Sequence, residues 1–227
     1  MASRKYPMPK RIVFLLLGGS LTDPEFLKNM WRIHRPQAVI CANGGARHAR
    51  DAGLKPTLIV GDMDSLPEEV RAHFRQEGIP EQVFPRVKDE TDAVIACKQA
   101  LALHPDEIWV FGAFGGRVDH MLANLSLLLM GEKNGVFVKL LDEAGEVFLV
   151  TREKFIEGKA GDTVSILALF EDAIGVTLEG FAYPLTKGEM KRDFPLGMSN
   201  RLGGERARIE VETGSLLVIK YFHSCGG

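Results

Sequence analysis

Two acidic residues stand at alternate positions directly after an apolar run. Asp62 and Asp64 belong to the stretch GDMDS at positions 61–65, which follows Leu-Ile-Val at positions 58–60. Alternate positions bring both carboxylates within reach of one hard cation, and Gly61 lets the backbone approach a bound group. Aspartate after a strand is also a common turn former. We interpret this stretch as a loop that binds Mg²⁺ and phosphate.

A second charged stretch, KDETD at positions 88–92, introduces a helical pattern over residues 93–103. Thr91 or Asp92 is the expected cap of this helix. Acidic residues at a helix start commonly do no more than complement the helix dipole. Because this helix start and the GDMDS loop are expected at one edge of a sheet, we favour Asp92 as a further ligand of the metal or of its bound water.

A third stretch, GGRVDH at positions 115–120, follows the apolar residues 108–111 and leads into a helical pattern. A fixed guanidinium such as that of Arg117 suits the negative charge that spreads over a transferred phosphoryl group. Lys88 is a second candidate for a phosphate contact, and each of these two cations could instead be a solvated surface charge. The sequence has no G-x-x-x-x-G-K-[ST] motif, which excludes a Walker-type NTPase.

The first half of the chain alternates short apolar runs with helical patterns, which predicts a mostly parallel sheet with flanking helices. The expected strands are residues 12–17, 38–42, 57–60, 82–84, 108–111 and 137–141. The expected helices are residues 24–33, 67–77, 92–103 and 119–130. Each charged stretch follows or precedes one of these elements, so in a parallel sheet all three converge on the edge where strands end.

After Asp142 glycines recur every few residues, and the runs between them are β-branched or aromatic. This pattern predicts a second, all-β sandwich-like domain or open barrel. Its expected strands are residues 146–150, 163–169, 175–178, 207–212 and 216–221. We expect a flexible segment over residues 1–11, an α/β domain over 12–142 and a β domain over 146–227. The polar stretch 185–204 is read as a long loop with a functional role.

The order of these motifs resembles that of the thiamine pyrophosphokinases. The matching pieces are NGGA at positions 43–46, GDMDS, KDETD and GGRVDH, followed by YPL at 183–185 and GMSN at 197–200. The resemblance spans roughly residues 12–200. One departure is Asn43, since the family usually has Asp at this position; an amide there is still able to bond a ribose or to order the loop.

The resemblance implies transfer of a diphosphate group from ATP to the hydroxyl of thiamine, with Mg²⁺ held by Asp62, Asp64 and Asp92. Arg117 would contact phosphate, and Asp119, otherwise a simple helix cap, would orient or deprotonate the hydroxyl. The residues expected to bind the nucleotide are Asn43, Gly44, Gly45, Gly61, Ser65, Lys88, Asp89, Thr91, Gly115, Gly116 and His120.

For thiamine the resemblance points to Ser199 and Asn200, whose hydroxyl and amide match an aminopyrimidine without burying a charge. Tyr183 is placed with them, although core packing is the more ordinary role for that ring. The resemblance also implies a homodimer, in which the β domain of one subunit faces the nucleotide domain of the other. Gly18 and Gly19, after the first strand, form either a simple turn or an adenosine contact.

The composition of the chain argues against several classes of protein, namely nucleic-acid-binding, membrane and disulfide-rich proteins. The chain has 28 basic and 30 acidic residues, a formal charge of −2, which gives no footprint for nucleic acid or an anionic membrane. Its three widely spaced cysteines form no disulfide framework and favour a cytoplasmic location. No segment approaches the roughly 20 apolar residues that a membrane helix requires.

Three alternatives share these motifs. One is a pyrophosphokinase that acts on another alcohol, such as a pterin, because acceptor choice depends on the poorly readable second half. Another is a non-catalytic module that binds adenine nucleotides, which Asn43 alone favours. The third is a metal-dependent phosphohydrolase, in which water replaces the acceptor alcohol.

Overall fold

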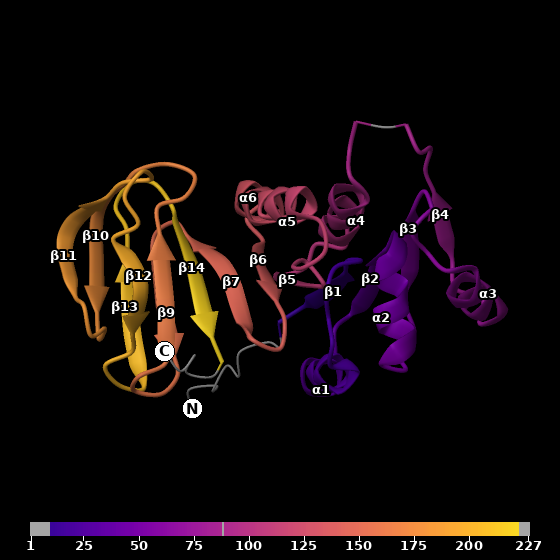
Figure 1. Ribbon diagram of the computed structural model, residues 1–227, viewed down its shortest axis with the longest axis horizontal. Coiled ribbons are helices and arrows are strands. Elements are labelled where there is room, and N and C mark those ends of the chain that lie inside the picture. Colours follow the sequence, from indigo (N-terminus) through magenta and orange to yellow (C-terminus); the bar gives the residue numbers. More distant parts are fainter. Residues whose placement is uncertain (1–9, 88, 223–227) are drawn as a thin grey trace, which may run out of the picture. The chain divides into compact units, whose positions relative to one another are not determined.

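The computed structural model describes residues 10–87 and 89–222. The chain divides into two compact units, unit 1 (Met1–Val138) and unit 2 (Lys139–Gly227), and Figure 1 shows the elements of each. Two of the sequence predictions lie outside the described residues: Lys88 as a phosphate contact, and most of the flexible segment 1–11. No helix in the described ranges is long and apolar enough to cross a membrane.

Unit 1 contains a parallel sheet in the order β5-β1-β2-β3-β4. Its strands are β1 (Ile12–Leu16), β2 (Ala38–Ala42), β3 (Leu58–Gly61), β4 (Glu81–Val83) and β5 (Glu107–Phe111). Every residue of β1, β2 and β5 is buried. Continuous burial is typical of parallel strands that are covered on both faces. The sequence prediction of these five strands is therefore correct to within one residue at each end.

The helices cover both faces of this sheet. They are α1 (Pro24–His34), α2 (Ala46–Asp51), α3 (Glu68–Gln76), α4 (Asp92–Leu101), α5 (Val118–Asn124) and α6 (Ser126–Lys133), with a 3₁₀ turn η1 (Asn43–Gly45). In Figure 1, α4, α5 and α6 lie on one side of the strands, and α1 and α2 lie on the other. Aromatic contacts fix the α1 side, where the rings of His34 and Trp109 lie 4.3 Å apart.

Two features of these helices differ from the sequence prediction. The single helix expected over residues 119–130 is divided at Leu125 into α5 and α6. The chain tightens there, because Leu125 N–H donates to Leu122 and Leu128 N–H donates to Leu125, each across three residues. The short elements η1 and α2 were not predicted, because the glycine pair after β2 indicates only a turn.

The strand order creates a crevice at the carboxyl ends of the central strands. β1 lies between β2 and β5, so the chain leaves this point of the sheet in two directions. In open α/β sheets such a switch point is where ligands bind, because the loops on either side of it turn away from each other. The predicted functional residues lie in the loops that follow β2, β3, β4 and β5, and Gly18 and Gly19 follow β1.

Unit 2 is built from antiparallel strands in two sheets, and β6 (Phe137–Leu141) contains the boundary between the units. One sheet pairs the second half of β6 with β7 (Gly145–Val150), then β14 (Leu216–Tyr221), β9 (Thr163–Leu167) and β12 (Gly197–Arg201). The other has the order β11 (Leu185–Met190), β10 (Ala173–Glu179), β13 (Arg206–Glu210) and β8 (Glu153–Glu157).

Both sheets of unit 2 contribute fully buried side chains, which include Val164, Ile166 and Val218 from one and Val176 and Ile209 from the other. The predicted sandwich-like β region is therefore confirmed. The prediction of a long loop over residues 185–204 is wrong, since this stretch contains β11 and β12. These are polar edge strands with few buried positions, so they lack the apolar alternation that identifies a strand in sequence.

Candidate active site

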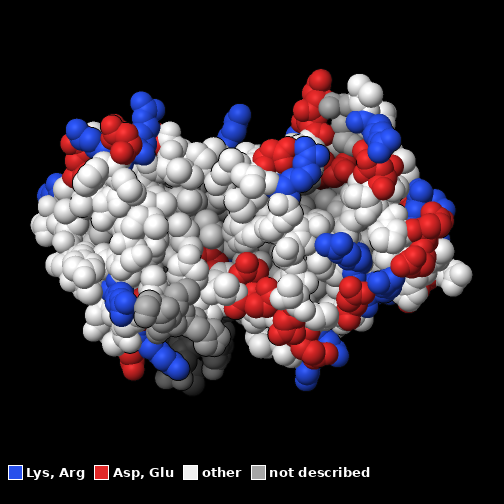
Figure 2. Space-filling model, in the orientation of Figure 1, with Lys and Arg blue, Asp and Glu red and all other residues white. Residues whose placement is uncertain are grey.

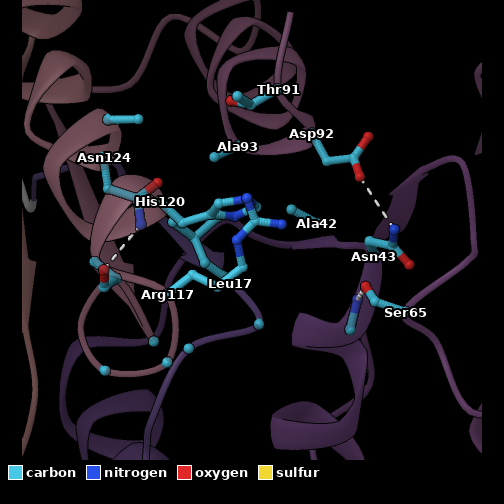
Figure 3. Close-up of a pocket in the computed structure, with 18 residues that line it drawn as sticks. Leu17, Ala42, Asn43, Ser65, Thr91, Asp92, Ala93, Arg117, His120 and Asn124 are labelled. Carbon is cyan, nitrogen blue, oxygen red and sulfur yellow. Dashed lines mark hydrogen bonds between the residues drawn. The ribbon is translucent and has the colours of Figure 1, made fainter. Parts of the chain in front are cut away.

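A pocket opens at the carboxyl ends of β1, β2 and β5, in unit 1 (Figure 3). It is lined by residues of the loops that follow these strands and β3, by the start of α4 and by residues along α5. Among the predicted site residues, its lining includes Asn43, Gly44, Ser65, Thr91, Asp92, Gly115, Gly116, Arg117 and His120. The pocket thus brings together parts of all three charged stretches of the sequence, at the crevice where a parallel sheet binds its ligands.

The three predicted metal-binding carboxylates converge on the side chain of Asn43. Its Nδ2 atom lies 2.7 Å from Asp62 Oδ1, 3.1 Å from Asp64 Oδ1 and 3.1 Å from Asp92 Oδ2. We call Asp62, Asp64 and Asp92 the acidic cluster, and Asn43 lies at its centre. Asp92 begins α4 and the other two acids follow β3, so the cluster joins segments some 30 positions apart.

Unusual backbone angles allow these side chains to meet. Asn43 has φ of 46°, a left-handed conformation that asparagine and aspartate tolerate better than other side-chain-bearing residues. Gly61 has φ of 140°, and a Cβ atom there would lie 3.0 Å from Asn43 Cβ and 3.1 Å from Asp92 Cγ. Glycine is therefore required at position 61, because any side chain would separate Asn43 from Asp92.

The GDMDS loop is closed by a local hydrogen bond. The backbone N–H of Asp64 donates to Asp62 Oδ1 over 3.1 Å, which turns both carboxylates toward Asn43. On its outer side Asp64 pairs with Arg86, whose Nη2 lies 2.9 Å from Asp64 Oδ2. This guanidinium, together with further hydrogen bonds, lowers the pKa of Asp64 below its usual value. Asp64 is therefore held in its charged form.

Arg86 was missed by sequence reasoning. It lies in the segment between β4 and α4, two positions before KDETD, and is exposed. The available signal was a basic residue close to an acidic stretch, but surface arginines of this kind are frequent and usually carry no function. Its pairing with Asp64 becomes visible only when the β3 and β4 loops are seen side by side.

The donor chemistry of the acidic cluster fits a hard divalent cation. It offers carboxylate oxygens from three residues, and the Oδ1 atom of Asn43 is buried without a hydrogen-bond partner among the described residues. As the side chains stand, no group of three or more acidic, His or Cys residues in the described chain is arranged to hold an ion. In this arrangement the Asn43 NH₂ group is the shared hydrogen-bond partner of the three carboxylates.

The loop after β5 presents Arg117 and His120 to the same pocket, and in Figure 3 both side chains extend toward its centre. Arg117 also forms an ion pair with Asp119, with Nε lying 3.1 Å from Oδ1. This guanidinium lowers the pKa of Asp119 to about 2. The lowered pKa makes the Asp119 carboxylate a weak base. Asp119 is also exposed and does not line the pocket.

The loop after β1 is fixed by residues that sequence reasoning did not select. Arg47 Nη2 donates to the carbonyl oxygens of Gly18 and Gly19, and the His48 ring donates from Nε2 to Gly19 over 2.9 Å. Across the crevice, Asn124 Nδ2 donates to Ala113 O over 2.8 Å and so fixes the loop after β5. Their signal in sequence was weak, because each binds backbone atoms of a loop that is distant in the sequence, and residue type alone does not reveal such a contact.

The remaining predicted residues of unit 1 have mixed positions. Thr91 is the N-cap of α4, since its Oγ1 accepts from Val94 N–H over 3.3 Å. Ser65 Oγ accepts from Gly44 N–H over 3.3 Å and joins the β2 and β3 loops. Gly45 is buried, and a Cβ atom there would lie 2.1 Å from Leu16 O, so it serves close packing behind the pocket. Asp89 is exposed and does not line the pocket.

The three residues predicted for thiamine lie in unit 2, around β12. Tyr183 is 70% exposed, so the alternative of core packing for its ring is wrong. Asn200 is only 2% exposed, and its amide exchanges hydrogen bonds with the backbone of Tyr183, at 3.0 Å and 2.8 Å. Ser199 is exposed, with φ of 53°, and its backbone N–H donates to Ser165 Oγ. The hydroxyl of Ser199 and the ring of Tyr183 are thus accessible, whereas the Asn200 amide is committed to the backbone.

Comparison with known proteins gives this arrangement its context. The family model described as "Thiamin pyrophosphokinase, catalytic domain" matches residues 27–140. The model described as "Thiamin pyrophosphokinase, vitamin B1 binding domain" matches residues 152–218. A thiamine pyrophosphokinase of Bacillus subtilis is 32% identical over 172 residues, which cover 75% of this chain and 80% of the relative. Thiamine pyrophosphokinase 3 of Oryza sativa is 26% identical over 224 residues, covering 86% of this chain and 81% of the relative.

Solved structures give the same result. The crystal structure of thiamine pyrophosphokinase from Bacillus subtilis matches with a TM-score of 0.82 and 28% identity, covering 94% of this chain and 100% of the other. The thiamin pyrophosphokinase of Geobacillus thermodenitrificans matches with a TM-score of 0.80 and 27% identity, covering 94% and 99%. The resemblance seen in the sequence motifs is therefore confirmed, and the chain belongs to the thiamin pyrophosphokinase family of enzymes.

Proposed function

We propose that this thiamine pyrophosphokinase takes ATP into the unit 1 pocket, binds Mg²⁺ at the acidic cluster and transfers diphosphate to the thiamine hydroxyl. The observation that carries the proposal is the meeting of Asp62, Asp64 and Asp92 at one nitrogen, beside a glycine-lined pocket at the switch point of the sheet. Carboxylate oxygens gathered in this way are the ligands that Mg²⁺ prefers in phosphoryl-transfer sites.

In this reaction the thiamine hydroxyl oxygen forms a bond to the β-phosphorus of ATP. The bond between that phosphorus and the oxygen bridging to the α-phosphate breaks, AMP leaves with the oxygen, and the hydroxyl proton passes to solvent. The acidic cluster would hold Mg²⁺, which when bound offsets the charge of the phosphates and fixes their orientation. The described residues best placed to act beside it are Arg117 and His120, which extend into the same pocket.

Arg117 supplies a fixed positive charge where the transferred group is most negative. Asp119 acts indirectly, by orienting Arg117. A carboxylate whose pKa is lowered to about 2 accepts a proton poorly near neutral pH, so Asp119 does not serve as a general base for the hydroxyl. This division agrees with the loose transition state of phosphoryl transfer, which requires charge stabilisation and alignment more than a strong base.

For the acceptor we propose the accessible surface around Ser199 and Tyr183 in unit 2. The neighbouring side chains of Phe194, Leu196 and Met198 are between 52% and 63% exposed. An apolar surface with one hydroxyl suits the two rings of thiamine, because ring faces prefer apolar contacts and ring nitrogens require a hydrogen-bond partner. In this assignment Asn200 holds the backbone that presents Ser199 and Tyr183.

We further propose that the enzyme is a cytoplasmic homodimer that completes the thiamine site at the subunit interface. Cys41 and Cys97 are free thiols in buried positions, and free cysteines are usual in a reducing compartment. Burial also raises the pKa of Cys97 to about 12, which makes this thiol unreactive. Sedimentation at working concentration tests the dimer. A monomer that retains full activity would overturn the shared site.

One assay separates this proposal from its alternatives. The purified chain is incubated with ATP, MgCl₂ and thiamine, and AMP and thiamine diphosphate are measured by chromatography, with the Asp92→Asn variant and EDTA as controls. We expect equal amounts of both products, formed only with thiamine. AMP formed only with a pterin alcohol would indicate another acceptor, AMP formed without any acceptor would indicate a hydrolase, and no AMP would indicate a nucleotide sensor.

A further inference from the structure

The Asn43 side chain occupies an exceptional position for a neutral residue. It is 5% exposed, and its single NH₂ group lies within 3.1 Å of carboxylate oxygens from three different residues. Figure 3 shows the side chain of Asn43 with its nitrogen directed to Asp92. An amide carries only two hydrogens, so three acceptors share them. The NH₂ group thus serves as the common partner of the acidic cluster.

The charge of its surroundings fixes the orientation of this amide. Facing three carboxylates, the NH₂ end is attracted and the carbonyl end is repelled, so only one of the two amide orientations is favourable without a cation. As a result of this orientation, the carbonyl oxygen Oδ1 at the other end of the amide is buried and accepts no hydrogen bond from the described residues. Unpaired buried carbonyl oxygens are uncommon and call for an explanation.

A divalent cation at the carboxylates reverses this preference. The carbonyl oxygen is then attracted as a hard oxygen donor, and the NH₂ group, with its positive hydrogens, is repelled. The cation and the NH₂ group therefore compete for the same carboxylate oxygens. Rotation of the amide through half a turn exchanges the two ends without moving the backbone.

We propose that Asn43 is an amide switch. Its NH₂ group holds the acidic cluster together when no cation is bound, and its Oδ1 turns to the cation when Mg²⁺ binds. This inference rests on the proposed Mg²⁺ site and adds a property of this chain's own residue. The cation displaces three hydrogen bonds on binding, so Asn43 lowers the Mg²⁺ affinity of the cluster and stabilises the metal-free protein.

The backbone at this position defines the variant that tests the switch. Because φ is 46°, an aspartate is accommodated about as well as asparagine, so Asn43→Asp changes charge and removes the NH₂ group with little change in strain. Asn29→Asp, on the exposed face of α1, adds the same charge away from the acidic cluster and is the matched control.

The test combines Mg²⁺ titration calorimetry with thermal unfolding of the full chain in EDTA and in MgCl₂. We expect Asn43→Asp to bind Mg²⁺ at least about tenfold more tightly than the wild type, because a fourth carboxylate attracts the cation. It should unfold at a lower temperature in EDTA and recover in MgCl₂. Asn29→Asp should match the wild type in both measurements. Equal Mg²⁺ affinity of Asn43→Asp and the wild type would overturn the proposal.

The rotation itself is visible by NMR in the wild type, so the test does not depend on folding of the variant in EDTA. The side-chain ¹⁵NH₂ signals of Asn43 are identified by their absence in Asn43→Asp in MgCl₂. We expect slow hydrogen exchange of these signals in EDTA, and a large shift with faster exchange at saturating Mg²⁺. Unchanged signals, with Mg²⁺ uptake that Asp62→Asn abolishes, would refute the switch and leave the proposed function intact. Absence of any Mg²⁺ uptake by the wild type would refute both.

Discussion

The two units place their proposed functional residues on different kinds of scaffold. In unit 1 they lie where parallel strands end and helices begin, and backbone angles at Asn43 and Gly61 bring distant segments together. In unit 2 they lie on β12 and near it, on an edge strand whose pairing with β9 is irregular. Figure 2 adds a contrast of charge, since acidic and basic side chains crowd over unit 1 while the visible face of unit 2 is largely uncharged.

The difference in scaffold matches the two parts of the proposed reaction. Transfer of a charged diphosphate requires charges held at fixed positions, which the rigid strand ends of a parallel sheet provide. Recognition of thiamine requires an accessible apolar surface with few polar groups, which an edge strand provides. Changes in unit 1 should therefore affect turnover most strongly, and changes in unit 2 should affect use of the acceptor or stability.

The largest effect is expected from loss of one carboxylate in the acidic cluster. Asp62→Asn or Asp92→Asn removes a charge that would hold Mg²⁺, and we expect kcat to fall about a thousandfold. Steady-state rates of AMP formation measure the effect, and circular dichroism checks that the fold is kept. Near-normal kcat in either variant would show that the replaced carboxylate does not bind the metal. It would also contradict the assignment of turnover to unit 1.

A smaller loss is expected at the basic side of the pocket. Arg117→Ala should lower kcat about a hundredfold, because the charge on the transferred group loses its fixed partner. Arg117→Lys keeps the charge but lacks the planar guanidinium, so its kcat should lie between those of the wild type and Arg117→Ala. If the alanine variant changes only the KM for ATP, then Arg117 binds the nucleotide equally in the ground state and the transition state.

Unit 2 supplies the contrasting kinetic test. Ser199→Gly removes the hydroxyl and keeps the positive φ of 53° that an alanine would strain. We expect kcat/KM for thiamine to fall about tenfold, the size of one lost hydrogen bond, with the KM for ATP unchanged. A change in the KM for ATP instead would show that the two units do not divide donor and acceptor as proposed.

The Asn200→Ala variant distinguishes a structural role of this side chain from direct contact with the acceptor. In Asn200→Ala the backbone groups of Tyr183 and the N–H of Arg201 lose their partners, and we expect unfolding free energy to fall by about 1–3 kcal/mol. Urea unfolding measures this loss. If stability is unchanged while the KM for thiamine rises, Asn200 touches the acceptor directly, and its assigned part in holding the backbone is wrong.

The smallest effect concerns pH. The pKa of Asp119 is lowered from 3.8 to about 2, so its pairing with Arg117 favours the folded state above pH 4 and is lost as the pH falls toward 2. In Arg117→Ala we expect the Asp119 carboxyl to titrate near its ordinary value. ¹³C NMR titration of the side chain measures this shift. A value unaltered by the substitution would mean that another group holds the carboxylate charged.

The sequence was a better guide to unit 1 than to unit 2, for physical reasons. Buried parallel strands are continuous apolar runs, so they were predicted. The start of α4 was predicted as well, with Thr91 or Asp92 as its cap, and the structure has Thr91 there. β11 has one buried residue and β12 has two, and neither strand shows apolar alternation. Their pairing is fixed by neighbouring strands, and this information is absent from their own residues.

The site follows the same division. The convergence of Asp62, Asp64 and Asp92 was expected from where strands end in a parallel sheet. The central place of Asn43 and the pairing of Arg86 with Asp64 were not, because they depend on side-chain directions set by the left-handed backbone at Asn43 and Met63. Such directions arise from loop geometry that residue types and spacing leave open.

The most direct test of the central claim is anomalous scattering from Mn²⁺ in crystals of the enzyme grown with a non-hydrolysable ATP analogue. Mn²⁺ takes the same oxygen ligands as Mg²⁺ and is visible at its absorption edge. We predict a peak within coordination distance of oxygens from Asp62, Asp64 and Asp92, beside the β- and γ-phosphates. A peak bound elsewhere, or one held by the nucleotide with none of these carboxylates, would contradict the account.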